Sequence, residues 1–257
     1  MAIISTAGLA RTFQTRNGPV EAVRGIDLTV RPGEILGFLG PNGAGKTTTL
    51  RMLTTLLPPT GGAATVAGHD LVKDPAAVRA KIGYVAQSGG VDPSETVRDE
   101  LVVQGRLYRL SRSEAVARAE ELARDLGLVD VLDRKTAALS GGQRRRLDIA
   151  MGLAHRPEVL FLDEPTTGLD PGSRADLWEL VRRLRDAHGT TVFLTTHYLD
   201  EADALSDRLV IVDRGAVVAE GAPAALKAEH GCTTLQDAFL AITGRGPAPV
   251  DTAPVAV

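Results

Sequence analysis

The stretch GPNGAGKT, from Gly40 to Thr47, decides the fold of this chain. It fits the pattern G-x-x-x-x-G-K-[ST], and it lies between an expected strand over 35–39 and an expected helix over 46–55. Glycine lets such a loop turn tightly and direct backbone N–H groups at phosphate oxygens. This context favours a phosphate-binding loop over a glycine-rich turn that merely caps a helix. The candidate nucleotide-binding residues are Gly40, Pro41, Asn42, Gly43, Ala44, Gly45, Lys46, Thr47 and Thr48.

Two side chains of this loop carry specific chemistry. Lys46 supplies a mobile positive charge for the β- and γ-phosphates, and it is therefore also a candidate catalytic residue. Thr47 offers a hydroxyl group to Mg²⁺. The loop therefore predicts ATP and Mg²⁺ as cofactors.

An acidic pair follows the apolar run from Val159 to Leu162, which is typical of a strand buried on both faces. Burying the carboxylates of Asp163 and Glu164 without partners would be costly. Alone, the pair could be an acidic turn before Pro165. Beside a phosphate loop, Asp163 is a candidate metal ligand, and Glu164 is a candidate base for the attacking water.

Strand patterns occur on both sides of a helical stretch. We expect strands over Lys81–Gln87, Thr191–Thr195 and Leu209–Val212, whereas residues 94–156 carry almost no strand signal. In that middle stretch, SRSE over Ser111–Glu114 matches a capping box, and Gly127 marks the end of its helix. The pattern predicts an α/β core interrupted by a helical insert.

Two further patterns support this division. Leucine and valine recur at helical spacing over 177–184, and Asp213-Arg214-Gly215 is typical of a turn between strands. The tail from Gly244 is rich in proline, glycine and alanine, so we expect it to be disordered.

Bulk composition limits the possible functions. The chain has 257 residues and a net charge of −3, whereas a protein that coats nucleic acid is usually more basic. Its one cysteine, Cys232, excludes an internal disulfide bond and fits a reducing compartment. We find no apolar run of roughly 18 residues and no signal peptide, so a membrane role would require a partner chain.

The most specific motif is ALSGGQRRR, from Ala138 to Arg146. LSGGQ resembles the signature motif of the ABC ATPases, and it lies about 20 residues before the acidic pair, as in that family. Ser140 with Gln143 is also an ordinary capping box, and both interpretations can hold together. The candidate nucleotide-binding residues of this motif are Ser140, Gly141, Gly142 and Gln143.

The resemblance implies a P-loop NTPase of the ABC-ATPase fold. This is an α/β fold whose RecA-like core carries an N-terminal antiparallel β region and an inserted helical subdomain. It implies an ABC ATPase domain over 1–243, with a nucleotide-binding core over 1–92 and 157–220, a helical signature subdomain over 93–156 and a C-terminal extension over 221–243. The flexible tail is then 244–257.

The resemblance also assigns four side chains outside the main motifs. Phe13 would stack on adenine, although it could be a core residue, and Gln87 would reach Mg²⁺ and the water, although it could be a plain strand-end amide. Asp170 would lie in the loop that crosses the dimer interface, or in an ordinary turn. His197 would contact the γ-phosphate as a catalytic residue, although a lone histidine is more often structural.

In this family, the signature of one subunit closes over the nucleotide held by the phosphate loop of the other. The resemblance therefore implies a homodimer with two shared ATP sites and a separate multi-span permease. The chain would lie at the cytoplasmic face of the cell membrane. Stretches such as RMLTTLLPPTGG and TTHYLDEAD are similar to the daunorubicin-resistance class, which implies export of a drug or antibiotic-like compound. Many members of that class carry glutamine at the position of His197.

Two alternatives belong to other functional classes. One alternative is a soluble ABC-type ATPase that acts on DNA or ribosomes. The types that act on DNA carry long coiled coils, for which residues 94–156 are too few, and the translation types carry two ATPase units in one chain, whereas this chain has one. A non-hydrolysing regulator is disfavoured by the presence of Glu164 and His197. We expect no nucleic-acid partner, and we interpret Arg144–Arg146 as the solvated face of the signature helix.

Overall fold

A computed structural model describes residues 1–244 in two sheets and the helices around them. The antiparallel sheet has the strand order β2-β1-β4-β5. Its strands are β1 (Ile4–Thr15), β2 (Gly18–Val30), β4 (Gly61–Val66) and β5 (His69–Asp70). The disorder expected over 244–257 concerns residues that, from 245 onward, lie outside the described part of the chain.

The second sheet has the strand order β10-β9-β3-β8-β7-β6. Its strands are β3 (Ile35–Leu39), β6 (Ile82–Val85), β7 (Val159–Asp163), β8 (Thr191–Thr196), β9 (Arg208–Asp213) and β10 (Ala216–Gly221). All neighbours are parallel except β9 and β10, which form a hairpin. Because β3, β7 and β8 lie side by side and run the same way, their carboxyl ends meet at one edge.

The helices before the acidic strand are α1 (Lys46–Leu53), α2 (Pro75–Lys81), α3 (Val97–Leu107), α4 (Arg112–Asp125) and α5 (Gly141–Gly152), with the short 3₁₀ helices η1 (Val129–Val131) and η2 (Thr136–Ala138). Those after it are α6 (Pro171–His188), α7 (Leu199–Leu205), α8 (Pro223–Glu229) and α9 (Leu235–Thr243). Within residues 1–244, no helix combines the length and the apolar character needed to cross a bilayer.

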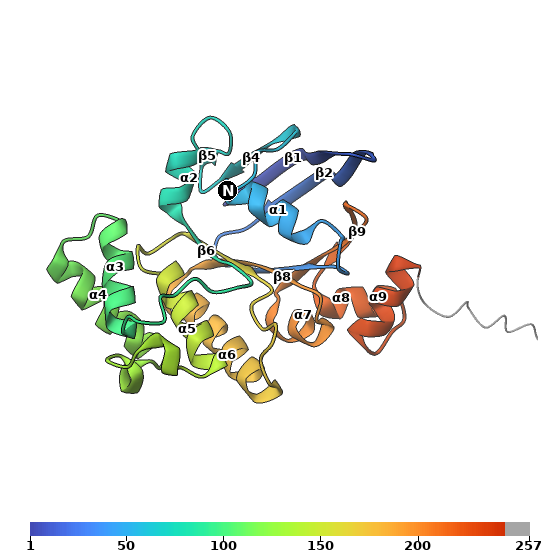
Figure 1. Cartoon of the computed structure of the whole chain (residues 1–257). Coiled ribbons are helices and arrows are strands. Elements are labelled where there is room, and N and C mark those ends of the chain that lie inside the picture. Colours follow the sequence, from blue (N-terminus) through green and yellow to red (C-terminus); the bar gives the residue numbers. More distant parts are fainter. Residues whose placement is uncertain (245–257) are drawn as a thin grey trace, which may run out of the picture.

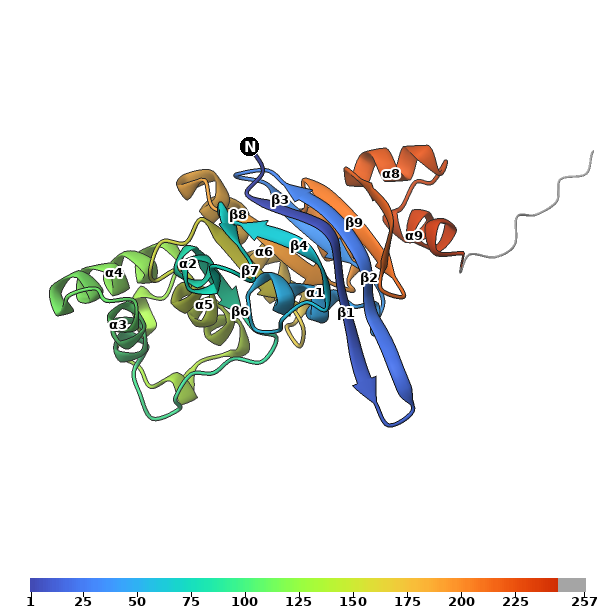
Figure 2. The ribbon, with the colours of Figure 1, turned by 90° about the horizontal axis from the view of Figure 1, so that it is seen from above.

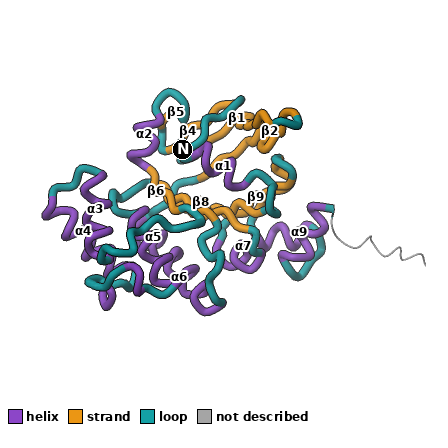
Figure 3. Tube along the Cα trace, in the orientation of Figure 1, coloured by secondary structure: helices purple, strands orange, loops and turns teal. Residues whose placement is uncertain are grey.

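Helix α1 lies between the two sheets, and α5, α6 and α7 cover the opposite face of the six-stranded sheet (Figures 1 and 3). One buried cluster joins Leu50 and Leu53 of α1 to Phe38 and Phe161 of the sheet. A second cluster joins Leu160 of the sheet to apolar side chains of α5 and α6. Burial of apolar surface on both sides of the sheet therefore holds the phosphate loop and its helix in place.

The antiparallel sheet and the helical insert lie on different sides of this core. Helices α3 and α4 project at one side, and the hairpin of β1 and β2 extends beyond the rest of its sheet (Figure 2). The insert contains helices and one isolated bridge between Thr96 and Lys135. The predicted α/β fold of the ABC-ATPase type is confirmed, whereas the domain boundaries stay a prediction.

Several local predictions need correction. The helix expected to reach Thr55 ends at Leu53, because Thr55 has a φ of 63°. The strand expected over 81–87 is shorter at both ends, since Lys81 closes α2 and Gln87 lies beyond the sheet. The solvated face expected at Arg144–Arg146 is wrong for its middle member. Arg145 is 6% exposed, because its position on α5 faces the sheet edge rather than solvent.

Other local predictions are confirmed. Ser111 and Glu114 form a reciprocal capping box at the start of α4. Leu177, Leu180, Val181 and Leu184 are all buried along one face of α6, as their spacing predicts. The turn at 213–215 joins β9 to β10. The residues themselves gave no prediction for strands β1, β2, β4 and β5. The alternation of Ile26, Leu28 and Val30 with exposed Asp27 and Thr29 in β2 was a signal that sequence reasoning missed.

Candidate nucleotide site

The loop Gly40–Thr47 connects β3 to α1, as the sequence predicts. Gly45 has a φ of 97°, and a Cβ there would lie 2.5 Å from the carbonyl oxygen of Ala22. A Cβ on Gly40 would lie 2.4 Å from the carbonyl oxygen of Val212. Both positions therefore require glycine, and the loop can wind closely around a ligand at the start of α1.

Lys46 bridges this loop to the acidic strand end. Its Nζ donates hydrogen bonds to the carbonyls of Gly40 at 2.8 Å and Pro41 at 3.1 Å, and lies 3.4 Å from Oε1 of Glu164. The side chain is 4% exposed, and burial lowers the pKa of Lys46, against the opposing effect of Glu164 and Asp163. A phosphate group would replace the lost hydration of this ammonium group.

Asp163 ends β7 beside the loop. Its Oδ1 accepts a hydrogen bond from Oγ1 of Thr47 at 3.2 Å and one from Oγ1 of Thr195 at 2.6 Å. Thr195 was missed by sequence reasoning. It lies in TVFLTT, and it is the register partner of Asp163 between β7 and β8, which only the strand pairing reveals. The two hydroxyl groups hold the carboxylate next to Thr47, the other candidate metal ligand.

Glu164 lies at the centre of the site. Its φ of 45° is rare for a residue with a side chain, and its N–H donates to both the carbonyl and the hydroxyl oxygen of Thr195. This backbone conformation turns Glu164 away from Asp163 and into the site. Oε2 then accepts hydrogen bonds from Nε2 of Gln87 at 3.1 Å and from Oγ1 of Thr167 at 3.4 Å.

His197 follows β8 at the same edge. Its Nδ1 lies 3.1 Å from Oε1 of Glu164, but it is buried and makes no hydrogen bond. The carboxylate of Glu164 therefore contacts one edge of the imidazole ring, while the His197 side chain is 28% exposed and lines the cavity. The structure thus brings Lys46, Gln87 and His197 around the one carboxylate of Glu164.

These groups line one cavity of about 710 Å³. Its lining residues are Ala22, Asn42, Gly43, Gly45, Lys46, Thr47, Thr48, Gln87, Glu164, Thr167 and His197. Ala22 and Thr167 had no sequence signal. The charged lysine and the loop N–H groups fit a nucleoside triphosphate, and Thr47 with Asp163 fits Mg²⁺, which prefers few protein oxygens together with phosphate.

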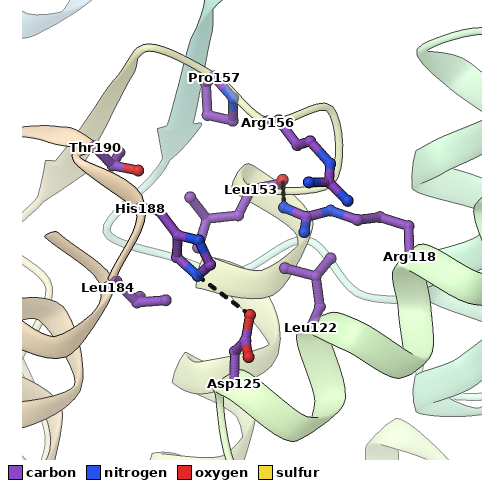
Figure 4. A pocket seen from close by; sticks show the side chains of 9 residues that line it. All are labelled: Arg118, Leu122, Asp125, Leu153, Arg156, Pro157, Leu184, His188 and Thr190. Atoms are coloured by element: carbon purple, nitrogen blue, oxygen red, sulfur yellow. Dashed lines mark hydrogen bonds and ion pairs between the residues drawn. The ribbon is translucent and has the colours of Figure 1, made fainter. Parts of the chain in front are cut away.

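A second cavity, of about 190 Å³, lies between α4, the loop after α5 and the end of α6 (Figure 4). Arg118 and Asp125 face it from α4, and His188 faces it from α6 (Figure 4). None of the predicted site residues lines it. The predicted site residues that line either of these cavities therefore all line the larger one.

The signature motif lies elsewhere. Ser140 caps α5, its Oγ accepts the N–H of Gln143 at 3.2 Å, and Oε1 of Gln143 accepts the N–H of Ser140 at 3.0 Å. The predicted capping box is confirmed. Ser140 and Gly141 are exposed, and neither lines the cavity of the phosphate loop.

Asp170 and Phe13 also lie outside the cavity lining. Asp170 caps α6, and hydrogen bonds from Ser173 lower the pKa of its carboxyl group. Phe13 lies on β1 with the guanidinium group of Arg11 4.8 Å from the ring centroid, so one face of the ring is covered. The structure therefore brings the phosphate loop, Asp163, Glu164, Gln87 and His197 together, but not the signature, Asp170 or Phe13.

The family model described as ABC transporter matches residues 23–167, which is more than half of the chain. The chain belongs to the ABC transporter family. The predicted resemblance and the prediction of an ATP-binding ATPase subunit are thereby confirmed.

Three relatives of this ABC ATPase are informative. The daunorubicin/doxorubicin resistance ATP-binding protein DrrA of Streptomyces peucetius is 51% identical over 233 residues, which cover 91% of this chain and 69% of that protein. The Nod factor export ATP-binding protein I of Burkholderia lata is 43% identical over 88% of this chain and 74% of that protein. A solved ATP-binding cassette, described as a dimer in a post-hydrolysis state bound to ADP and phosphate, matches with a TM-score of 0.76 and 26% identity. The match covers 85% of this chain and 98% of that chain.

Proposed function

We propose that two copies of this ABC ATPase pair head to tail, hydrolyse ATP with Mg²⁺ at two shared sites, and drive a separate membrane permease. The observation that carries the proposal is the separation of two anion-binding helix starts within one chain. One, at Lys46, is surrounded by reactive side chains, and the other, at Ser140, is exposed and faces none of them. The similarity to a dimeric cassette supports the pairing.

Each residue has a distinct part in this proposal. Lys46 and the loop N–H groups bind the phosphates, and Thr47 and Asp163 would hold Mg²⁺. That ion supplies charge neutralisation at the β- and γ-phosphate oxygens. Glu164 accepts a proton from the attacking water, which Gln87 helps to orient. His197 contacts the γ-phosphate, since its ring lines the cavity beside Glu164.

The proposal also includes the remaining predictions. Phe13 stacks on adenine with the ring face that Arg11 leaves free. Ser140, Gly141, Gly142 and Gln143 close over the nucleotide of the partner chain, with Asp170 beside them. The signature motif already lies close to the loop that holds Asp170. A Cβ on Gly141 would lie 3.7 Å from the side chain of Leu169, the residue before Asp170. Residues 93–156 act as a helical signature subdomain.

Complementation between two defective chains tests the pairing directly. Lys46→Ala removes the phosphate loop's charge and leaves the signature intact. Gly141→Asp places a carboxylate where the partner's phosphate would bind, without a clash, because the nearest atom to a Cβ is an ordinary 3.7 Å away. Each variant alone should hydrolyse ATP poorly, and an equal mixture should recover activity above either variant alone. The upper limit is about a quarter of wild-type activity, reached when the two sites act independently, since half of random dimers contain one intact site in two.

The control is a mixture of Lys46→Ala with Glu164→Gln chains, which puts both defects in the same half of the site. This mixture should recover nothing, since neither arrangement rebuilds a complete centre. Recovery in the control, or no recovery in the first mixture, would contradict the head-to-tail arrangement.

We further propose that the permease docks in a groove beside Gln87. The groove has a volume of about 230 Å³ and is lined by the strand end at Tyr84–Ala86, the loop 88–90, and Gln104, Asp148 and Met151 of the insert. A segment bound there would contact the core and the helical insert together. The names of two relatives, one for daunorubicin/doxorubicin resistance and one for Nod factor export, support efflux of a drug or antibiotic-like compound rather than an action on DNA or ribosomes. A chain that drives such a permease would lie at the cytoplasmic face of the membrane.

Efflux can be tested in a drug-sensitive host. The chain should confer resistance to an anthracycline when it is expressed with a multi-span permease of the drug-exporter class, and the Glu164→Gln chain should not. Each component alone should give no resistance. Equal sensitivity with and without the wild-type pair would exclude anthracyclines, and binding of the purified chain to DNA or ribosomes would favour the alternative.

A further inference from the structure

The basic run Arg144–Arg146 has side chains with three different surroundings. Nη2 of Arg144 donates to the carbonyl of Thr136 at 3.2 Å, and Nη2 of Arg146 lies 3.4 Å from Oδ2 of Asp176. Both of these residues are at least partly exposed. Arg145 is buried, and the mechanism above gives it no part.

Arg145 donates to three backbone carbonyls at the catalytic edge of the sheet. Nε donates to the carbonyl of Pro165 at 2.7 Å, and Nη2 donates to that of Asp163 at 3.2 Å. These two residues flank Glu164 on either side. Nη1 donates at 2.6 Å to the carbonyl of Ala86, the residue directly before Gln87.

The cost of burying this guanidinium group makes the arrangement specific. Burial lowers the pKa of Arg145, against the attraction of nearby carboxylates that include Asp148 at 3.7 Å. A buried cation is tolerated only when its donors are satisfied. The planar guanidinium group presents several donors in fixed directions, whereas lysine and glutamine cannot reach all three carbonyls at once.

Arg145 belongs to the same rigid helix as the signature. It follows the cap Ser140 by five positions, which is about 7.5 Å along the axis of α5 at 1.5 Å per residue. When the start of a rigid helix shifts, the guanidinium group shifts with it. Its hydrogen bonds then displace the three carbonyls, two of which flank Glu164 while the third precedes Gln87.

We propose that Arg145 is a positioning residue that couples the two ATP sites of the dimer. When the signature of one chain closes on the partner's nucleotide, α5 takes a defined position, and Arg145 fixes Glu164 and Gln87 of its own chain in the hydrolytic arrangement. This inference rests on the proposed head-to-tail dimer. It makes each chain sense the nucleotide of the other site.

A second buried arginine provides a matched control. Arg118 of α4 is 9% exposed and donates to the carbonyls of Leu153 at 2.7 Å and Ala154 at 3.2 Å, just after the other end of α5 (Figure 4). It also pairs with Glu121 at 2.7 Å. Arg118 thus resembles Arg145 in burial and in its carbonyl partners, but it contacts nothing at the catalytic edge.

The experiment compares Arg145→Gln, Arg145→Lys and Arg118→Gln in the full chain. We expect both Arg145 variants to bind ATP with wild-type affinity under conditions without turnover, because Arg145 does not line the cavity. Their kcat should fall roughly 10- to 100-fold, since small displacements of catalytic groups have effects of that size. The Hill coefficient for ATP hydrolysis should fall from near 2 toward 1.

Arg118→Gln should lower Tm about as much as Arg145→Gln and should leave the Hill coefficient and kcat near wild type. If Arg145→Gln does not fold, Arg145→Lys keeps the charge and carries the same prediction. A wild-type Hill coefficient in a folded Arg145 variant would overturn the proposal, and so would an equal loss in Arg118→Gln, because general loosening of α5 would then explain it. Failure of the dimer itself would instead appear in size-exclusion chromatography, where the Glu164→Gln chain with Mg²⁺·ATP would stay monomeric.

Discussion

Two helix starts in this chain share one feature and differ in everything around it. At both α1 and α5, glycines leave backbone N–H groups free to face an anion. At α1, Lys46 is 4% exposed and contacts Glu164, with Asp163 and His197 nearby. At α5, the cap Ser140 is exposed, and its partner is Gln143 of its own turn.

The difference shows how one kind of backbone geometry can have two functions. The α1 start collects buried charges that can bind, orient and react with a triphosphate. The α5 start offers dipoles alone, so it can stabilise negative charge but cannot hydrolyse anything. Under the proposed head-to-tail pairing, the α1 start of one chain and the α5 start of the other would form one complete site.

The largest expected effect comes from the carboxylate at the centre of the α1 site. Glu164→Gln should reduce kcat by about 10²- to 10⁴-fold, because it removes the proton acceptor for the attacking water. ATP affinity should be retained, and size-exclusion chromatography with Mg²⁺·ATP should show a stable dimer. Glu158→Gln, at the exposed start of the same strand, should behave like wild type. Normal turnover by Glu164→Gln would remove the assigned role.

The next effect concerns the cation of the same site. Lys46→Ala should weaken ATP binding by about two orders of magnitude, since charge-assisted hydrogen bonds contribute roughly 1.5–3 kcal/mol each. Equilibrium binding of a fluorescent ATP analogue measures this directly. Lys81→Ala, which breaks only the exposed ion pair with Glu158, is the control and should leave affinity unchanged.

The α5 start can be weakened in a matched pair. Ser140→Ala and Ser111→Ala each remove the serine of a reciprocal capping box, so both should cost about 1 kcal/mol of stability. Only Ser140→Ala should also reduce the rate of ATP hydrolysis. The loss should be roughly tenfold, which corresponds to one hydrogen bond to the partner's nucleotide. Equal ATPase activity of the two variants at matched dimer concentration would mean that the α5 start contacts no nucleotide.

The smallest expected effect lies at the edge of the α1 site. Phe13→Ala should weaken ATP binding by about fivefold, near the lower limit for loss of an aromatic stack on a base, because Arg11 already covers one ring face. Phe13→Tyr should restore affinity, since it keeps the ring. The same measurements with GTP test the assignment, because a stacking platform accepts every base. An unchanged affinity in Phe13→Ala would identify Phe13 as a structural residue.

Sequence reasoning located the chemistry better than the supporting contacts. The motif of Gly40–Thr47 and the pair after Leu162 identified the cavity, because their function constrains consecutive residues. Thr195 and Thr167 gave no signal, because a threonine near a strand end is common and its value depends on which strand lies beside it. The prediction of a solvated face at Arg144–Arg146 was wrong for Arg145 for the same reason. Three consecutive arginines cannot be assigned to buried and exposed positions of a helix unless the elements that pack against it are known.

The sequence by itself determined the order of the phosphate loop, the helical insert and the acidic strand, the glycines of the loop and the identity of the reactive side chains. These follow from local rules, since a tight turn, a capping box and a buried strand each leave a pattern within a few residues. Only the tertiary structure decided that Glu164 meets Lys46, Gln87 and His197, and that Arg145 ties the signature helix to the ends of two strands. Those contacts join residues far apart in the chain, and packing of the sheet and its helices, rather than any local pattern, brings them within hydrogen-bonding distance.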